Sequence, residues 1–228
     1  MKYVLITVFF GFLLGFALAL VGLYYNPIIA DSGVITGVNA RTFTYQSPFT
    51  EGLAVTHSGR SRLPLRPTAI PELWENTIRN SLLSLVVLYD EENVPVGIAS
   101  RVSQLSDSTE LLTRGVLIDD DWLVSIPGEG SFFIEADSNL WPFLKETLIP
   151  VWYLDRPWQG PKHYRPTAGP GDEGTATVSG VTGSFANREG TAVEIYHISD
   201  FNRTTGPGRV DAQLYLHLPE VVTSLAAE

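Results

Sequence analysis

The chain of 228 residues contains no cysteine and only one methionine. Without cysteine there can be no disulfide bond, no thiol nucleophile and no thiolate metal ligand. The stability of an exported domain would therefore have to come from a hydrophobic core, for which the chain is long enough. The absence of cysteine is compatible with a bacterial periplasm.

Basic residues are also scarce, because 15 lysines and arginines stand against 25 acidic residues and give a formal net charge of −10. Lys2 is the only charged residue in the first 25, so the rest of the chain carries 14 basic and 25 acidic residues, a charge of −11. A domain this acidic is not expected to bind nucleic acid nonspecifically. Its many aromatic, β-branched, glycine and proline residues are typical of strands joined by tight turns.

Motifs with a defined chemistry are missing as well. The four histidines lie too far apart in sequence to form a metal-ligand pair, and no serine lies in a G-x-S-x-G elbow. Residues 169–174 match G-x-G-x-x-G, but a proline-rich loop precedes them and a strand follows, so we interpret them as a turn. Asp119-Asp120-Asp121 is interpreted as a solvated hairpin turn, since consecutive acids do not converge on a cation. The sequence predicts no catalytic residue, cofactor or metal site.

One long apolar run is present, from Val4 to Leu23, with Thr7 as its only polar side chain. Twenty helical residues span about 30 Å, the thickness of a bilayer's hydrocarbon core. Lys2 places the N-terminus inside, so we expect a single-pass protein of the inner (cytoplasmic) membrane. Residues 1–25 would be the anchor, and residues 26–228 a periplasmic or extracellular domain.

A cleaved signal peptide is the alternative interpretation of this run. Ala17-Leu18-Ala19 has the small-x-small pattern of a cleavage site, which would release the domain by a cut near Ala19. The chain stays apolar beyond that point, however, and Tyr24-Tyr25 resembles the aromatic belt at the end of a membrane helix. The uncleaved anchor is therefore favoured.

Small residues recur every four positions in the run, at Gly11, Gly15 and Ala19. In lipid such a stripe lets two helix backbones approach closely, so helix pairing is one hypothesis. The other is composition alone, because glycine and alanine are common in membrane helices.

The exported part is predicted to be a β-dominated α+β domain. Strands are expected at 34–38, 42–45, 94–102, 116–118, 122–126, 132–134, 151–154, 175–185, 191–198 and 210–218. Helices are expected from Pro71 onward and between Ser138 and Pro150, with 82–89 open to either form. The last strand alternates most strictly, which is the habit of antiparallel sheets with one face on a core. We therefore expect a sandwich or a curved, barrel-like sheet with one or two short helices.

A loop rich in aromatic and basic residues is the candidate binding site. Between Trp152 and Arg165 no acid follows Asp155, although the domain as a whole is acidic. Aromatic rings offer flat apolar contact, and arginine can hold an anionic group through two hydrogen bonds. The candidate residues are Trp152, Arg156, Trp158, His163, Tyr164 and Arg165, together with Arg60 and Arg62 from a second basic stretch. The alternative is that the rings pack onto the sheet and the charges balance nearby acids.

These features favour a noncatalytic accessory or binding protein, held at the membrane by one helix. Its partner would be a protein or an anionic amphiphile, that is, an apolar-anionic ligand. The second hypothesis is an exported hydrolase of envelope material in which His163 or His57 is the general base.

Overall fold

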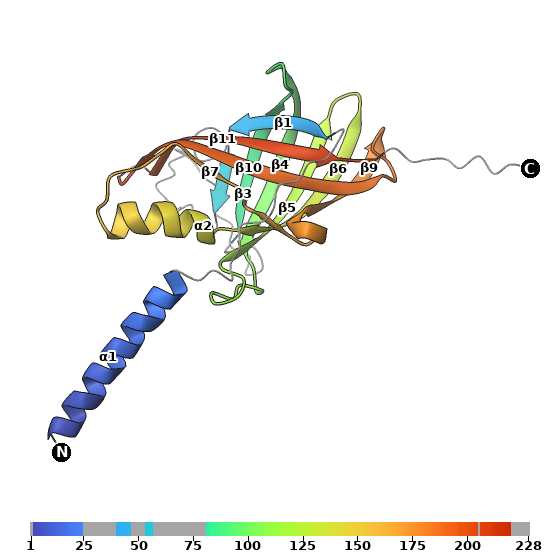
Figure 1. Cartoon of the computed structure of the whole chain (residues 1–228). Helices are drawn as coiled ribbons and strands as arrows, with labels where there is room; N and C mark the ends of the chain where they lie inside the picture. Colours follow the sequence, from blue (N-terminus) through green and yellow to red (C-terminus); the bar gives the residue numbers. More distant parts are fainter. Residues whose placement is uncertain (1, 25–39, 47–52, 57–80, 205, 220–228) are drawn as a thin grey trace, which may run out of the picture.

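The computed structural model describes residues 2–24, 40–46, 53–56, 81–204 and 206–219 (Figure 1). The elements are α1 (Lys2–Tyr24), β1 (Arg41–Gln46), β2 (Leu53–Thr56), β3 (Leu82–Tyr89), β4 (Pro95–Leu105), β5 (Leu117–Ile126), β6 (Gly130–Asn139), α2 (Trp141–Phe143), the π-helix η1 (Leu144–Tyr153), β7 (Lys162–Tyr164), β8 (Thr167–Gly169), the 3₁₀ turn η2 (Asp172–Gly174), β9 (Ala176–Gly183), β10 (Glu189–Asn202) and β11 (Gly206–His217). The predicted strand at 34–38 and the start of the helix at Pro71 lie outside these residues.

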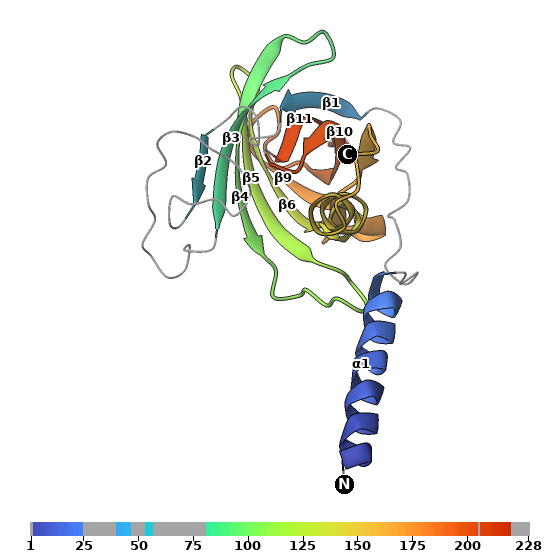
Figure 2. The ribbon, with the colours of Figure 1, turned by 90° about the vertical axis from the view of Figure 1, so that its left-hand side faces the viewer.

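The strands form an antiparallel barrel, so the prediction of a β-dominated fold is confirmed. In the described part of the chain the strands follow the order β1-β11-β10-β9-β6-β5-β4-β3. The pairing of Thr44 with Tyr89 joins β1 back to β3 and closes the circle of eight. β2 adds to the outer side of β3, while β7 and β8 pair with β10 and β6 (Figure 2). A barrel of this size can be filled by side chains or can hold one small ligand.

Helix α1 projects from the barrel, away from the strands (Figures 1 and 2). Its residues Tyr3 to Gly22 are apolar and long enough to cross a membrane, and they are exposed. A single helix of this kind at the N-terminus is consistent with an anchor and with a signal sequence. The side chain of Lys145 in η1 lies 5.7 Å from the ring centre of Tyr24, so the end of α1 lies beside η1.

The inward face of β4 differs from the predicted one. The sequence places the valines and Ile98 toward the core, but Ile98 is 49% exposed and Val102 is 37% exposed. The opposite face points inward and carries Gly97, Ala99 and Arg101. The interior of an eight-stranded barrel is narrow, and this strand contributes two small side chains and one charged side chain there, while Ile98 and Val102 lie outside.

One half of the barrel is packed solid. Phe132 contacts Phe185 edge-to-face with ring centres 5.0 Å apart, and Tyr45 contacts Trp122 at 5.7 Å. The alternation predicted for the last strand is confirmed in β11, whose inward side chains are buried in or beside this core: Val210, Ala212, Leu214 and Leu216. This cluster closes the end of the barrel that carries the β3–β4, β5–β6 and β9–β10 turns.

Three local predictions are wrong. Asp119-Asp120-Asp121 lies within β5 and forms no turn, because β5 pairs along its whole length with β6 and the hairpin turn follows Ile126. The helix predicted to end at Pro150 continues to Tyr153, so the strand expected at 151–154 is helical. The long loop at 155–174 contains the two short strands β7 and β8.

Candidate functional site

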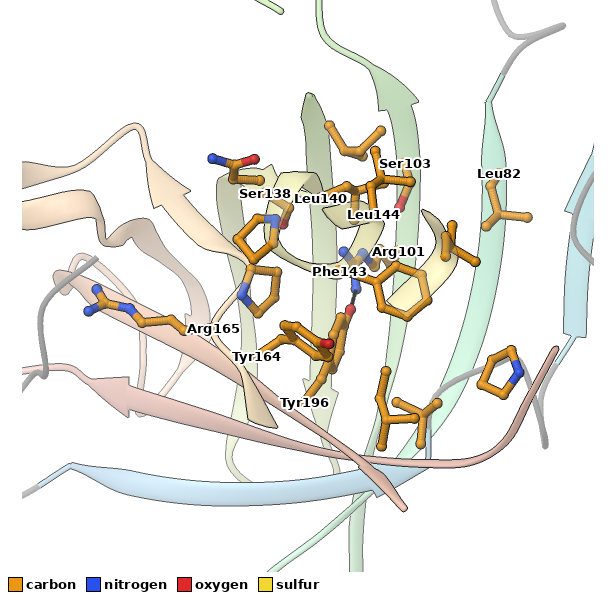
Figure 3. Close-up of a pocket in the computed structure, with 18 of the residues that line it drawn as sticks. Leu82, Arg101, Ser103, Ser138, Leu140, Phe143, Leu144, Tyr164, Arg165 and Tyr196 are labelled. Atoms are coloured by element: carbon orange, nitrogen blue, oxygen red, sulfur yellow. Dashed lines mark hydrogen bonds between the residues drawn. The ribbon is translucent and has the colours of Figure 1, made fainter. Parts of the chain in front are cut away.

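A cavity of about 310 Å³ occupies the other half of the barrel, at the end where α2 and η1 cross it. This volume lies at the lower end of the range usual for small-molecule sites, and its walls are mainly apolar. Its lining includes Leu82, Leu105, Ile118, Leu140, Phe143, Leu144, Leu148, Ile198, Phe201 and Val210. Phe143 and Leu144 enter it from the covering helices (Figure 3). The cavity is therefore bounded by the barrel wall on its sides and by helix at its mouth.

Arg101 lies at the inner end of the cavity, held by a buried carboxylate. Its Nε donates to Oδ1 of Asp120 at 2.8 Å, and its Nη2 donates to Oδ2 of the same residue. Ser103 donates a further hydrogen bond to Asp120, whose side chain is fully buried. The guanidinium also lies 4.8 Å from the ring centre of Trp122. Burial opposes the charge, but Asp120 and Tyr196 outweigh it and raise the pKa of Arg101 above its ordinary value.

A second buried carboxylate, Glu194, contacts the same guanidinium. Its Oε1 lies 3.2 Å from Nη1 of Arg101, and the hydroxyl of Tyr45 donates to it. Burial raises the pKa of Glu194 to about 8, from an ordinary value of 4.5. The Arg101 cation has little effect on the pKa of Glu194. We attribute this to Asp120, which already neutralises Arg101 through two hydrogen bonds. Glu194 consequently changes its protonation state close to neutral pH.

Tyr196 connects these charges to the cavity. Its hydroxyl accepts a hydrogen bond from Nη1 of Arg101 at 2.6 Å (Figure 3). The same hydroxyl also hydrogen-bonds to Glu194. Burial raises the pKa of Tyr196 well above its ordinary value, so the phenol stays protonated. Among the described residues, Arg101 has partners for its Nε, for both Nη1 hydrogens and for one Nη2 hydrogen. One N–H of Arg101 and the phenol of Tyr196 are thus polar donors at this end of a mainly apolar space, whose lining also includes serine and amide side chains.

The opposite wall carries a second phenol, that of Tyr164 on β7. Tyr164 is buried, and its hydroxyl lies 2.6 Å from Oγ1 of the fully buried Thr147 on η1. Burial raises the pKa of Tyr164 to about 12. Its ring packs edge-to-face against Phe143, so this hydrogen bond ties the covering helix to the barrel.

The aromatic residues of the predicted loop mainly pack against other aromatic side chains. Trp152 and Trp158 are half-buried, and their rings lie 5.8 and 5.9 Å from that of Phe201, at the outer side of the cavity. Tyr164 lines the cavity, whereas Arg156 is exposed. The loop therefore contributes aromatic side chains to the cover of the barrel.

Of the basic members of the predicted site that the structure describes, Arg165 lines the cavity and Arg156 does not. The guanidinium of Arg165 points away from the other labelled residues, and its Nη2 donates to the carbonyl of Gly174 at 3.2 Å (Figure 3). Burial lowers the pKa of Arg165. Arg60 and Arg62 lie outside the described residues. On α1, Gly11, Gly15 and Ala19 are exposed, and the space around the two glycines is open.

His163 lies on the exposed side of β7, where it pairs with His197 of β10. Nδ1 of His197 is 3.2 Å from Nε2 of His163, and the ring centres are 4.4 Å apart. His163 is not among the residues that line the cavity. Within the described ranges, no group of three or more histidine, aspartate or glutamate residues is placed to hold a metal ion. His57 lies outside the described residues.

The sequence analysis missed the three charged residues inside the barrel. Arg101 is the only charge in β4, Glu194 is the only acidic residue between Thr191 and Ile198 of β10, and Asp120 was assigned to a turn. A lone charge in such a strand is a usable signal, since burying it requires a partner. Arg101 lies 19 positions from Asp120 and 93 positions from Glu194 in the sequence, so these three residues meet only when the barrel closes.

No protein family model matches the chain, and no curated protein matches it. Several solved chains are similar to it, among them the following two. One is described as a nonspecific heme-binding cyclase that catalyzes a [4 + 2] cycloaddition in neoabyssomicin biosynthesis, with a TM-score of 0.42, 9% identity and coverage of 82% of this chain and 66% of that one. The other is the Diels Alderase AbmU from Streptomyces koyangensis, with a TM-score of 0.39, 9% identity and coverage of 78% and 62%.

These comparisons correct one expectation. These two structures are enzymes by their descriptions, whereas the sequence favours a noncatalytic accessory or binding protein. The chain spans no more than about two thirds of the length of either structure.

Proposed function

We propose that the chain is an enzyme that rearranges one small, mainly apolar molecule bearing a carbonyl group. The observation that carries this proposal is the chain's own cavity, which is mainly apolar and has the donors of Arg101 and Tyr196 at its inner end. A cavity at the lower end of the usual size range favours a single substrate, and hence an isomerisation or ring closure within it.

The carbonyl oxygen would lie against Tyr196, and the rest of the molecule against the leucine and phenylalanine side chains. In a space that excludes water, donors already in place stabilise negative charge that develops on such an oxygen. Arg101 supplies a fixed positive charge behind the phenol, since Asp120 holds its orientation. A rearrangement conserves all atoms, so the proton and the double bonds are redistributed within the substrate.

The protonation of Glu194 regulates the donor in this scheme. When Glu194 is ionised, it is a strong acceptor for the phenol of Tyr196. Protonation of Glu194 makes it a weaker acceptor, so the phenol of Tyr196 is free to donate to the substrate. The active form is then the one with neutral Glu194, which prevails below about pH 8.

We further propose that α1 is an uncleaved anchor with its N-terminus in the cytoplasm and the barrel on the outer side of the inner membrane. The supports are the exposed apolar helix, Lys2 before it and Tyr24 at its end.

The test is turnover of a panel of unsaturated ketones of increasing carbon number by the full-length protein in nonionic detergent. Binding is followed by the fluorescence of Trp122 and its neighbours, and conversion by mass spectrometry and NMR. Tyr196→Phe should lower kcat by about 10²–10³-fold with little change in Kd, because it removes a donor to the developing charge. Tyr215→Phe is the matched control, since its hydroxyl is hydrogen-bonded to Gln213 on the exposed side of β11. Binding without conversion of any compound would refute catalysis.

A further inference from the structure

We infer that the mouth of the cavity rests on the bilayer surface, so that the substrate enters from the membrane. This inference depends on the proposals that α1 is an anchor and that the cavity holds an apolar substrate. Its independent support is the distribution of exposed apolar side chains at one end of the barrel.

The connection between β4 and β5, residues 106–116, lies at the same end of the barrel as the cavity. Leu105, at the start of this connection, lines the cavity and is itself 61% exposed. Within the connection, Leu111 is 46% exposed and Leu112 is 67% exposed. Two consecutive exposed leucines on a loop gain free energy by entering an apolar phase, at roughly 25 cal/mol per Å² of apolar surface removed from water.

The end of α1 lies at this same end of the molecule. Both views show the green connection between β4 and β5 reaching toward the C-terminal end of α1 (Figures 1 and 2). The contact between Tyr24 and Lys145 brings that end to η1, whose first residue, Leu144, lines the cavity. A tyrosine at the end of an apolar span is characteristic of the headgroup region. The leucines and the cavity mouth would then lie close to the headgroups.

The other end of η1 also carries exposed large side chains. Tyr153 is 80% exposed and Leu154 is 51% exposed, which is unusual for large apolar side chains at the end of a covering helix. The opposite end of the barrel is more acidic. Its β3–β4 turn carries three acids, Asp90 to Glu92, and no basic residue, whereas the 106–116 connection carries two acids and one arginine. The less acidic end, with its exposed leucines, would face the lipid, with the cavity mouth against it.

A depth measurement tests the orientation directly. Because the chain has no cysteine, Leu111→Cys provides a single site for an environment-sensitive fluorophore, and Glu91→Cys provides the matched site at the opposite end. The full-length labelled proteins are placed in phosphatidylcholine vesicles with and without spin-labelled lipid. The label at 111 should be quenched several-fold more strongly than the label at 91. Equal quenching at the two sites would overturn the inference.

A transfer measurement separates this inference from the proposed function. The probe is an apolar ketone from the panel that binds the wild-type protein, delivered either from vesicles or from detergent. Replacing both leucines, Leu111→Ser with Leu112→Ser, should slow uptake from vesicles at least several-fold and leave binding from detergent unchanged. Equal uptake by the variant and the wild type would refute entry from the membrane. Failure of the wild type to bind any ketone in detergent would refute the proposed function, while the quenching result would still decide the orientation.

Discussion

The protonation of Glu194 gives the most direct prediction, because it links a buried charge to the stability of the whole barrel. The carboxyl group is 5% exposed, and burial raises its pKa from 4.5 in the unfolded chain to about 8 in the folded one. Below pH 4.5 the group is protonated in both states and contributes no pH dependence. Between the two pKa values the folded protein holds one proton more than the unfolded chain, so stability falls as the pH rises.

The size of the effect follows from the shift. Each pH unit in this window removes about 1.4 kcal/mol of stability, so the whole window amounts to on the order of 5 kcal/mol. Typical domains are stable by about 5–15 kcal/mol in total, so the loss is large enough to measure. Glu194→Gln is the corresponding perturbation, since glutamine keeps the shape and does not ionise.

The assay is denaturant unfolding of the full-length protein in nonionic detergent at several pH values from 4.5 to 8.5, followed by tryptophan fluorescence. Other groups titrate as well, so the quantity of interest is the difference between the wild type and Glu194→Gln. The wild type should lose stability relative to the variant by about 1.4 kcal/mol per pH unit up to pH 8, and then no further. Glu135→Gln, on the exposed face of β6, serves as the control and should run parallel to the wild type. Parallel curves for the wild type and Glu194→Gln would refute the assignment of a neutral buried carboxyl group.

Two further predictions concern the buried ion pair and the helix. Asp120→Asn leaves Arg101 with weaker partners inside the barrel and should destabilise the protein by about 3–5 kcal/mol in the same unfolding assay; a loss below about 1 kcal/mol would mean that Glu194 compensates the charge alone. Gly15→Ile should weaken self-association of α1 in a membrane-helix assay if the small residues of the helix pair in lipid, and an unchanged signal would remove that hypothesis.

The strands at the C-terminal end could be predicted from the sequence because their patterns are local. Val210 to Leu216 alternate strictly with polar residues, and that alternation settles both the secondary structure and the inward face of β11. In β4 the same reasoning chose the wrong face. Its larger apolar side chains point outward, and its inward face carries Gly97, Ala99 and the charged Arg101, an arrangement that the apolar pattern alone does not indicate.

The candidate site could not be predicted because its members come together only when the barrel closes. Asp120 is one of three consecutive acids, and only the register of β5 with β4 turns it toward Arg101. The aromatic loop was identifiable from composition, but its tryptophans pack on Phe201, a residue that carried no signal of its own. The composition of the loop therefore indicated residues that cover the cavity, but it did not indicate the charged residues at the cavity's inner end.

The charges inside the barrel explain why one proton affects both stability and chemistry. With both carboxylates ionised, the single cation Arg101 leaves a net charge of −1 in a space closed to water, and such a charge is costly to bury. Taking up one proton makes the cluster neutral, and Glu194 is the site for it because Asp120 already accepts two hydrogen bonds from the guanidinium. The proton that stabilises the fold is thus the one that frees Tyr196 to donate into the cavity. Stability should consequently decline as the pH rises from 4.5 to about 8 and then level off, whereas activity should decline as the pH rises through about 8. Wild-type activity that persists unchanged well above pH 8 would show that the phenol is not the donor.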